Sequence, residues 1–380
     1  MKEIYLDNAA TTALNPRARE AMLTFLADDG NPSAIYRRAM KSRAALTKAR
    51  EAAAALIKAS PSEIYFTSGG TEADNWALKA VFEKARAEGK TPHMITQKTE
   101  HHAVLETCRY LEEQGAAVTY LDVDRCGIVS PAAVEAAIRP ETCLISVMTA
   151  NNETGCLQDV SAIGHIAGEH GVLFHTDAVQ AYGHIPLDVN ASAVDLMSVS
   201  AHKCGGPKGT GFLYIRKGTA VGAFLHGGAQ ERGRRAGTEN TVGIVGFGAA
   251  AEAAASSMED NRVRLLELRR FLTEGLMRAV PGCYLNGGSH RLPGHVNMTF
   301  PGIDGEALLI YLDMKGIAAS AGSACASGSL SPSHVLTAMG LSYGDAHGTI
   351  RMTLSPDLSE EDLQFVIDTI KKGCDNIRRM

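Results

Sequence analysis

The chain has 380 residues, of which 45% are hydrophobic and 21% charged, and its formal net charge is -5 at pH 7. This length predicts two to three domains and a large core, and the acidic balance, with Lys and Arg scattered, argues against direct nucleic-acid binding. The first residues lack the apolar core of a signal peptide, and no apolar run reaches membrane-spanning length. We therefore expect a cytoplasmic protein with no membrane partner.

The cysteines place a further limit on the chemistry. There are eight of them, and no two stand as Cys-x-x-Cys. The sequence therefore predicts neither a zinc site nor a dithiol redox site. Reduced thiols are expected in a cytoplasm, and most should be small buried hydrophobic residues, with one or two at most carrying chemistry.

The elements in chain order begin with two helices, at residues 15–27 and 37–58. Asn15 caps the first, Pro16 opens it, and Ser60-Pro61 ends the second. From residue 63 onward short apolar strands alternate with helices. Seven strands are predicted, at 63–66, 93–97, 118–123, 144–148, 172–176, 195–200 and 211–215, with helices at 72–88, 103–113, 131–138 and 160–169. This alternation predicts an α/β fold with a mainly parallel seven-stranded sheet between helices.

The remainder of the chain lacks this regular alternation of strands and helices. A long helix is predicted over 239–280. Short strands at 295–300, 317–320 and 348–354 then mix with helices at 305–315, 333–339 and 359–378. This mixture predicts a smaller α+β domain at the C-terminal end. We assign residues 15–255 to a large domain, and residues 1–14 together with 256–380 to a small one.

Polar residues follow several of the predicted strands, where a parallel sheet binds its ligands. Ser68-Gly69-Gly70-Thr71 suits a phosphate, although it is also an ordinary strand-to-helix turn. His101 and His102 could stack on a ring or simply cap a helix. Asn151 and Asn152 suit ligand binding, but Asn is also common in turns.

Two charged residues complete the series of strand ends. Asp177 ends an apolar strand and needs a partner, for which a protonated ring nitrogen is one candidate. Lys203 follows the strand at 195–200. By itself it is more typical of a solvated loop, but a desolvated lysine forms Schiff bases. Taken in order, these loops supply what pyridoxal phosphate requires.

The same stretches carry a family resemblance that covers nearly the whole chain. The sequence resembles the cysteine desulfurases, in the class V branch of the fold-type I pyridoxal-phosphate transferases, and in particular the group with the long Ser-Ala-Cys catalytic loop. The matching stretches are residues 5–12, 67–75, 99–105, 151–155, 175–180, 200–211, 226–238 and 320–336.

The resemblance implies a role for each matching residue. It implies a Schiff base between the cofactor and Lys203, ring stacking and proton transfer by His101, and binding of the substrate carboxylate by Arg351 and Asn152. It also implies that Thr238 reaches the cofactor phosphate of a partner subunit, hence a homodimer. The cofactor contacts that it implies are Gly70, Thr71, Ser200 and His202 at the phosphate, and Asn152, Asp177 and Gln180 around the ring.

Cys325 decides the reaction that the resemblance implies. It lies among Gly, Ser and Ala, in a stretch that we expect to be mobile. The resemblance makes it the acceptor that takes sulfur from L-cysteine as a persulfide, with L-alanine as co-product. The sulfur would then pass to an iron–sulfur scaffold or a tRNA-thiolation protein. Cys204, beside Lys203, is the rival thiol, and we expect it to point away from the ring.

Some alternatives stay open at this point. A selenocysteine lyase would share the whole site, and a class V aminotransferase would share Lys203 without needing Cys325. No intrinsic metal is expected, although transient ligation of a cluster iron by Cys325 is not settled. Tyr36 stands where the family usually has a histidine, which leaves substrate or partner preference in doubt.

Overall fold

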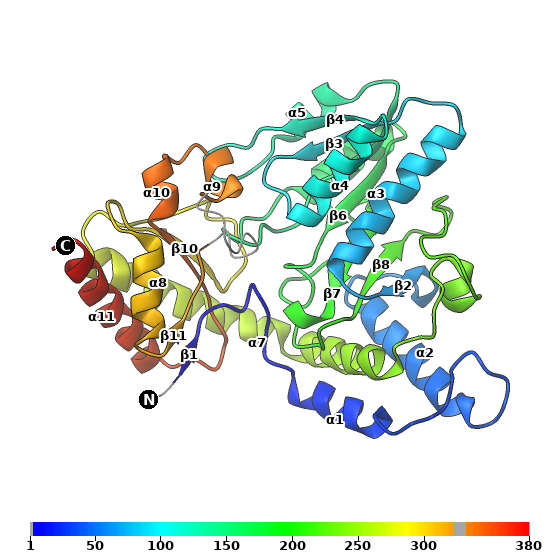
Figure 1. The fold of residues 1–380 in the computed structure, drawn as a ribbon, viewed down its shortest axis with the longest axis horizontal. Helices are drawn as coiled ribbons and strands as arrows, with labels where there is room; N and C mark the ends of the chain where they lie inside the picture. The colour runs from blue at the N-terminus through cyan, green and yellow to red at the C-terminus, as the bar shows by residue number, and fades with distance from the viewer. Residues whose placement is uncertain (1–2, 322–331, 380) are drawn as a thin grey trace.

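The computed structural model describes residues 3–321 and 332–379. Its largest element is a seven-stranded sheet in the order β2-β8-β7-β6-β5-β3-β4 (Figure 1). Only β8 runs antiparallel to its neighbours, β2 and β7. The predicted mainly parallel α/β sheet is therefore confirmed. Its strands are β2 (Ile64–Thr67), β3 (His93–Gln97), β4 (Ala117–Leu121), β5 (Thr142–Ser146), β6 (Leu173–Asp177), β7 (Leu196–Ser200) and β8 (Gly211–Ile215).

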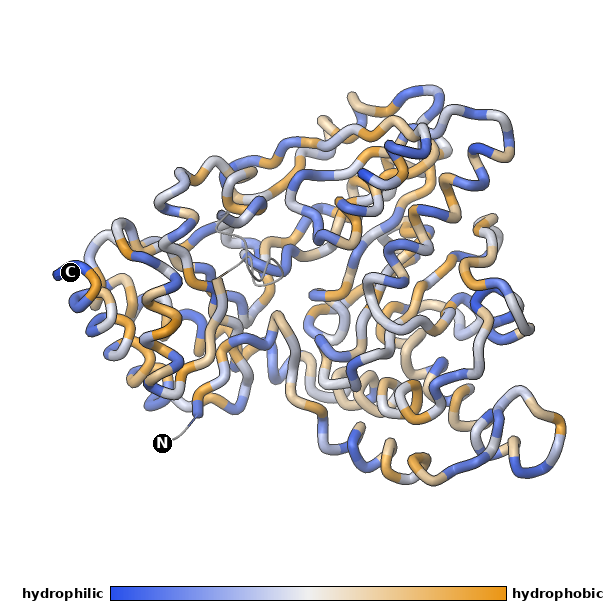
Figure 2. Tube along the Cα trace, viewed as in Figure 1, coloured by the Kyte–Doolittle hydropathy of each residue, from blue (hydrophilic) through white to orange (hydrophobic). Residues whose placement is uncertain are grey.

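Helices cover both faces of this sheet because alternate residues of each strand point to opposite sides. Tyr65 belongs to one hydrophobic core with α3 (Gly70–Ala87) and α4 (His102–Glu113). Its neighbours Ile64 and Phe66 belong to the other core. This other face of the sheet packs against α2 (Ala39–Ala55), α5 (Pro131–Ala137), α6 (Val160–Glu169) and the first half of α7 (Thr241–Ala279). Figure 2 shows hydrophobic and hydrophilic residues alternating along α3, as expected for a helix with one buried side.

The helix α7 connects the sheet to a second core. Ile244 and Phe247, in its first half, pack against the sheet, where α1 (Pro16–Phe25) and α2 also contact it. Leu268 and Leu276, in its second half, pack in a separate hydrophobic cluster. Figure 1 shows the helix running beneath both parts of the molecule. The change of core falls near residue 255, and the domain boundary assigned there stays a prediction.

The second core contains both ends of the chain. Its three-stranded antiparallel sheet has the order β12-β10-β9, and β1 pairs in parallel with β11 beside it. Ile4 and Leu6 from the N-terminal end pack here with residues of the C-terminal helix. The elements are β1 (Ile4–Tyr5), β9 (Tyr284–Leu285), β10 (His295–Thr299), α8 (Gly305–Asp313), β11 (Ile317–Ala318), α9 (His334–Ala338), α10 (Tyr343–His347), β12 (Thr349–Thr353) and α11 (Glu360–Ile377).

Several small elements differ from the sequence prediction. The strands β1 and β9 and the helix α10 were not predicted, and β11 is two residues long rather than four. Such short segments contain too few residues for a hydrophobic period, so tertiary pairing decides them. Among the described residues, no helix combines the length and apolar character that crossing a membrane requires.

Candidate active site

A cavity of about 390 Å³ lies at the carboxyl ends of the parallel strands. The loops after β2, β3, β5, β6 and β7 all reach it, together with the N-terminal segment and β12. Ten of the twelve residues implicated by the sequence line it: Gly70, Thr71, His101, Asn152, Asp177, Gln180, Ser200, His202, Lys203 and Arg351. Gly70 and Lys203, which are 133 positions apart in the chain, are thus brought into one space.

The first turn of α3 forms one wall of the cavity. Gly70 begins this 18-residue helix, whose N-terminus carries unpaired N–H groups and a partial positive charge. A Cβ at position 70 would lie 2.6 Å from Cγ2 of Val179, so only glycine fits here without displacing the wall. The resulting concave backbone surface, with the Thr71 and Ser200 hydroxyls nearby, suits a phosphate group.

His101 is fixed in orientation by the helix that it caps. Its Nδ1 accepts a hydrogen bond of 3.1 Å from the backbone N–H of Ala103, so the ring hydrogen of the neutral form is on Nε2. Burial first, and then the charge of Lys203, lower the pKa of His101 from 6.5 to about 4. At neutral pH the ring is therefore uncharged, which suits stacking against another ring and hydrogen bonding from Nε2.

The two asparagines after β5 have different places. Oδ1 of Asn151 accepts hydrogen bonds from the N–H groups of Glu153 and Thr154, at 2.9 and 3.0 Å. This buried side chain therefore holds the turn together. Asn152 instead lines the cavity. Asn151 thus has a structural role in the turn, and Asn152 is the one that faces a ligand.

Asp177 ends β6 with a buried carboxylate that faces the cavity. Oδ1 accepts a hydrogen bond of 2.8 Å from the N–H of Val179. Burial raises the pKa of Asp177 from 3.8 to about 6, although that hydrogen bond and the charge of Lys203 oppose the shift. The carboxyl is therefore negative at neutral pH, and a protonated ring nitrogen would be a strong partner for it.

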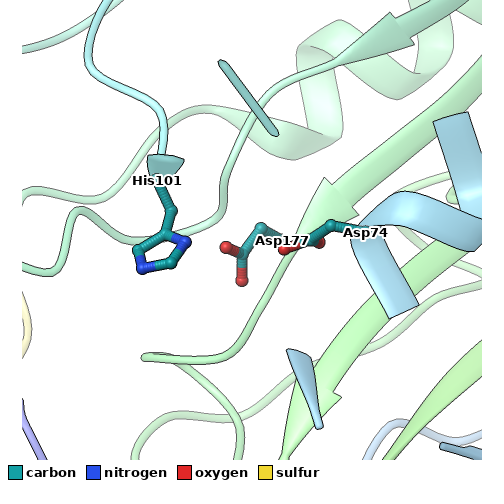
Figure 3. Close-up of side chains that lie close together, drawn as sticks. All are labelled: Asp74, His101 and Asp177. Carbon is teal, nitrogen blue, oxygen red and sulfur yellow. The ribbon is translucent and has the colours of Figure 1, made fainter. Parts of the chain in front are cut away.

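Asp74 is a cavity residue that the sequence reasoning missed. It comes from α3, and Figure 3 shows it beside Asp177, with His101 on the other side. One side-chain atom from each of the three lies within 4.8 Å of the others. Burial, and then the charge of Asp177, raise the pKa of Asp74 well above its usual range. The buried pair therefore disfavours two negative charges side by side, and Asp74 is the member that burial and its neighbour push toward the neutral form. A polar residue one helical turn beyond the phosphate turn was the signal available in the sequence.

Lys203 projects into the cavity from the turn that follows β7. Its Nζ donates hydrogen bonds to the carbonyl oxygens of Ala9 and Ala10, at 2.6 and 2.7 Å. The N-terminal segment is thus part of the lysine's environment. Gln180 also contacts this segment, through a 3.0 Å hydrogen bond from Nε2 to the Ala9 carbonyl.

Arg351 approaches the same cavity from β12. Its side chain is almost fully buried, and Nη2 donates a 2.7 Å hydrogen bond to Oδ1 of Asp7. Nη1 donates to the backbone carbonyl of Asn152 at 3.1 Å, while Nε has no hydrogen-bond partner among the described residues. The guanidinium is therefore held in place with part of its hydrogen-bonding capacity unused, which suits a carboxylate ligand.

None of the seven cysteines in the described ranges lines this cavity. Sγ of Cys204 donates to the Ala201 carbonyl at 3.3 Å, and burial raises the pKa of this thiol to about 12. Cys204 borders a neighbouring cavity instead, so it is poorly suited to attack a ligand beside Lys203. Cys325, the predicted sulfur acceptor, lies outside the described residues.

Two further residues do not line this cavity. Thr238 is exposed, and so is Tyr36, with 51% of its surface accessible. Neither therefore acts on the cavity of its own chain in this structure. The cavity also includes Ala9, Ala10, Met148 and Val179, apolar residues that carry no sequence signal for function.

The comparisons with known proteins agree with this architecture. A family model described as aminotransferase class-V matches residues 4–366, so the chain belongs to the class-V aminotransferase family. Within it, the chain is 50% identical to a cysteine desulfurase IscS of Methanosarcina thermophila, over all of this chain and 94% of that protein. It stands in the cysteine desulfurase branch.

Solved structures give the same result. A NifS-like protein superposes with a TM-score of 0.91 at 38% identity, over 98% of this chain and 99% of that one. A structure described as SspA in complex with cysteine superposes with a TM-score of 0.83 at 38% identity, over 93% of this chain and 99% of that one. The fold is therefore that of fold-type I transferases that depend on pyridoxal phosphate.

The cavity residues fit this cofactor. The side-chain-free wall at Gly70 leaves room for a phosphate at the start of α3. Asp177 supplies a buried negative charge for a ring nitrogen, His101 an uncharged ring, and Lys203 an amine for the aldehyde. Each chemical group of the cofactor thus has a complementary group in one cavity.

Proposed function

We propose that this chain is a cysteine desulfurase that converts L-cysteine into L-alanine and holds the sulfur as a persulfide on Cys325. The observation that carries the proposal is the meeting of Lys203 and Arg351 in one cavity. An amine that anchors the cofactor and a fixed guanidinium for a carboxylate together suit an α-amino acid. The cysteine found in one related structure belongs to the same substrate class.

The chain's own residues supply binding and proton transfer. Pyridoxal phosphate, when bound, supplies an electron sink for the substrate α-carbon. Arg351 binds the substrate carboxylate, and Asp7 keeps the guanidinium in place. Lys203 would hold the cofactor aldehyde, and its amine would take the α-proton as a general base. Its hydrogen bonds to the Ala9 and Ala10 carbonyls restrict where Nζ can move.

The sulfur-transfer step belongs to Cys325 in this proposal. Its thiolate attacks the substrate sulfur, the sulfur–sulfur bond forms, and the carbon–sulfur bond breaks. The electron pair of the broken bond stays with the carbon skeleton, which takes up protons and leaves as alanine. L-cysteine and one thiol thus give L-alanine and one persulfide. The seven described cysteines provide no rival in the cavity.

The chain on either side of Cys325 is attached beside the cavity. Ser320 exchanges backbone hydrogen bonds with Arg351, at 2.7 and 3.1 Å. Ser333 donates a 2.5 Å hydrogen bond to Glu153, and His334 contacts the carbonyl of Glu100. Both attachment points therefore adjoin residues of the proposed substrate site, which supports Cys325 as the acceptor.

The deciding experiment compares Cys325→Ala with Cys204→Ala. We expect Cys325→Ala to lose alanine formation from cysteine and the protein-bound persulfide, and to keep the visible absorbance of the cofactor. Cys204→Ala should keep both activities, because Cys204 lies outside the cavity. Full desulfurase activity in Cys325→Ala would refute the assignment. Amino transfer to a keto acid would indicate an aminotransferase, and exclusive turnover of selenocysteine would indicate a lyase.

A homodimer is part of the proposal. Thr238 is exposed and outside its own cavity, as expected for a residue that reaches a partner's phosphate. Large apolar side chains are also exposed along one stretch of sequence: Leu23, Leu26, Ile35, Tyr36 and Met40. We expect light scattering to give about twice the 40.3 kDa chain mass. A monomer that keeps full activity would contradict shared sites.

The destination of the sulfur and the cellular location follow from the same proposal. An acceptor protein, either an iron–sulfur scaffold or a tRNA-thiolation protein, would take the persulfide sulfur. Transfer of labelled sulfur from the loaded enzyme to each purified acceptor distinguishes the two. A cytoplasmic location, expected from the composition, stays a prediction that cell fractionation tests.

A further inference from the structure

Two arginines of the described chain are more than nine-tenths buried, and only one of them has a counter-charge. Arg351 is 3% exposed and pairs with Asp7 at 2.7 Å. Arg291 is 8% exposed, and no carboxylate in residues 3–321 or 332–379 lies within ion-pair distance of it. A buried charge without a partner costs several kcal/mol. Arg291 therefore requires an explanation.

The hydrogen bonds of Arg291 leave one nitrogen unused. Nε donates to the carbonyl of Gly288 and Nη2 to that of Gly287, both at 2.8 Å. These bonds fix the guanidinium plane against the turn at residues 286–289. Nη1 is buried and has no hydrogen-bond partner within the described structure. The guanidinium plane is thus fixed in advance, and its unpaired Nη1 is enclosed by protein.

A second arginine increases the positive charge at this place. Arg269, on α7, donates from Nη1 to the carbonyl of Leu292 at 2.9 Å. Burial first, and then the charge of Arg291, lower the pKa of Arg269. Two neighbouring guanidinium groups repel each other, so an anion between them would stabilise both.

These side chains line a cavity of about 690 Å³ between α7 and residues 285–291. Arg269, Arg291 and the exposed Arg270 contribute three positive charges to its lining, and Glu267 contributes the single negative one. Glu267 lies 3.7 Å from Arg264, which is outside the lining. The lining therefore carries a net charge of about +2, and it shares no residue with the Lys203 cavity.

We propose that this cavity on the small domain is a binding site for a small phosphate-class oxyanion. Guanidinium groups, here those of the less buried Arg269 and Arg270, match the oxygens of phosphate or of a phosphomonoester. A net charge of +2 favours a dianion over a singly charged carboxylate. The site lies apart from the proposed catalytic machinery, so the inference does not depend on the proposed function.

The test titrates the holoenzyme, whose own phosphate site is filled by the cofactor. Inorganic phosphate and glycerol phosphate are added in separate arms, with chloride adjusted to hold the ionic strength constant. Binding is followed by calorimetry and by the thermal midpoint. We expect saturable binding in the wild type. Binding of inorganic phosphate alone would show that the site takes the free anion. Binding of glycerol phosphate as well would show that it also takes phosphomonoesters.

Three variants on α7 decide whether the binding belongs to this cavity. Arg269→Gln should weaken binding by about tenfold or more, because it removes a charge-assisted hydrogen bond. Arg278→Gln, the matched control, removes a positive charge from the same helix, where its partner Glu274 is also outside the lining, and should change binding much less. Glu267→Gln should tighten binding, because it removes the competing carboxylate. These variants leave the turn held by Arg291 intact.

Two results would overturn the proposal. The first is an absence of saturable binding to the wild type at constant ionic strength. The second is equal weakening by Arg278→Gln and Arg269→Gln, which would show that overall charge, and not this cavity, attracts the anion.

Discussion

Asp177 is a buried carboxyl whose charge determines how firmly a pyridinium can be held. Its pKa is raised to about 6, mainly by burial. Above that pH the cofactor-free carboxyl is negative and pairs with a protonated ring nitrogen. As the pH falls through about 6 the carboxyl takes up a proton and this attraction is lost. We expect cofactor release after dilution of the holoenzyme to increase as the pH falls across this range.

Asp177→Asn is the control for that prediction. It cannot titrate, so it should release cofactor readily at every pH, with any residual pH dependence coming from the phosphate and Lys203. Release is measured from the visible absorbance that stays with the protein after gel filtration. Parallel pH profiles for the two proteins would show that Asp177 is not the titrating group.

Arg351 gives a second prediction at the residue scale. Asp7 and the Asn152 carbonyl fix its guanidinium, and a lysine cannot reproduce the planar fork. We expect Arg351→Lys to raise KM for cysteine by about 10- to 100-fold, the range of a charge-assisted hydrogen bond of about 1.5–3 kcal/mol. Steady-state kinetics check it, with the cofactor absorbance as a control for an intact site. An unchanged KM would place the carboxylate elsewhere.

The residue scale also shows where sequence reasoning stopped. Strand-end positions placed His101, Asp177 and Lys203 beside one sheet edge, and the cavity contains all three. Chemistry alone could not choose between His101 and His102, because the choice depends on which ring the fold turns toward the cavity, and that ring is His101. Asp74 was missed because a helical carboxylate is normally solvated, and only the packing shows that it is buried.

At the scale of elements, α2 and α7 pack unusually closely at one glycine. A Cβ on Gly248 would lie 2.5 Å from Cα of Ala49, which is backbone and cannot rotate away. We expect Gly248→Ala to lower the free energy of unfolding by about 1–3 kcal/mol through overpacking. Denaturant unfolding followed by circular dichroism measures it.

Gly168→Ala serves as the matched helix control. Gly168 is exposed on α6, and nothing lies within 4 Å of a Cβ built there. The Gly168→Ala substitution should therefore raise the free energy of unfolding by about 0.5–1 kcal/mol, because alanine favours the helix. If Gly248→Ala stabilised the protein equally, the inference that α2 and α7 leave no room for a side chain at Gly248 would be wrong.

The elements that could be predicted are those with a full hydrophobic period. β3, β8 and α6 have the predicted bounds, since turn residues and periodicity both mark their ends. β1 consists of two residues and exists because it pairs with β11, more than 300 residues away in sequence. No local pattern encodes such a partner.

At the scale of the whole molecule, buried acids make stability depend on pH. Burial raises the pKa of Glu100 from 4.5 to about 8. Between these values the folded state holds a proton that the unfolded state releases, so this group's contribution is present below pH 4.5 and is lost as the pH rises through about 8. We expect Glu100→Gln, which mimics the neutral acid, to flatten the fall in unfolding free energy over this range.

Denaturant unfolding at several pH values tests this, with Glu106→Gln as the control. Glu106 is on α4, directly after the turn that carries Glu100, but its side chain is 58% exposed. Its replacement should leave the pH dependence close to that of the wild type. Identical slopes for wild type and Glu100→Gln would mean that Glu100 is charged in the folded protein.

The predicted architecture was confirmed for the α/β sheet, because the alternation of strands and helices extends over 150 residues. The division into domains is supported by the two cores and stays a prediction. The roles of Thr238 and Cys325 depend on a partner chain and on residues outside the described ranges.

The N-terminal segment of ten residues contributes both to the small domain and to the candidate active site. It contributes a strand of the small domain, the carboxylate that holds Arg351, and the carbonyls that bind Lys203. A deletion of this segment would therefore act as a catalytic lesion as well as a folding one. For the same reason, a tag or fusion inserted between Leu6 and Thr11 should be far more damaging than one at the C-terminal end of α11.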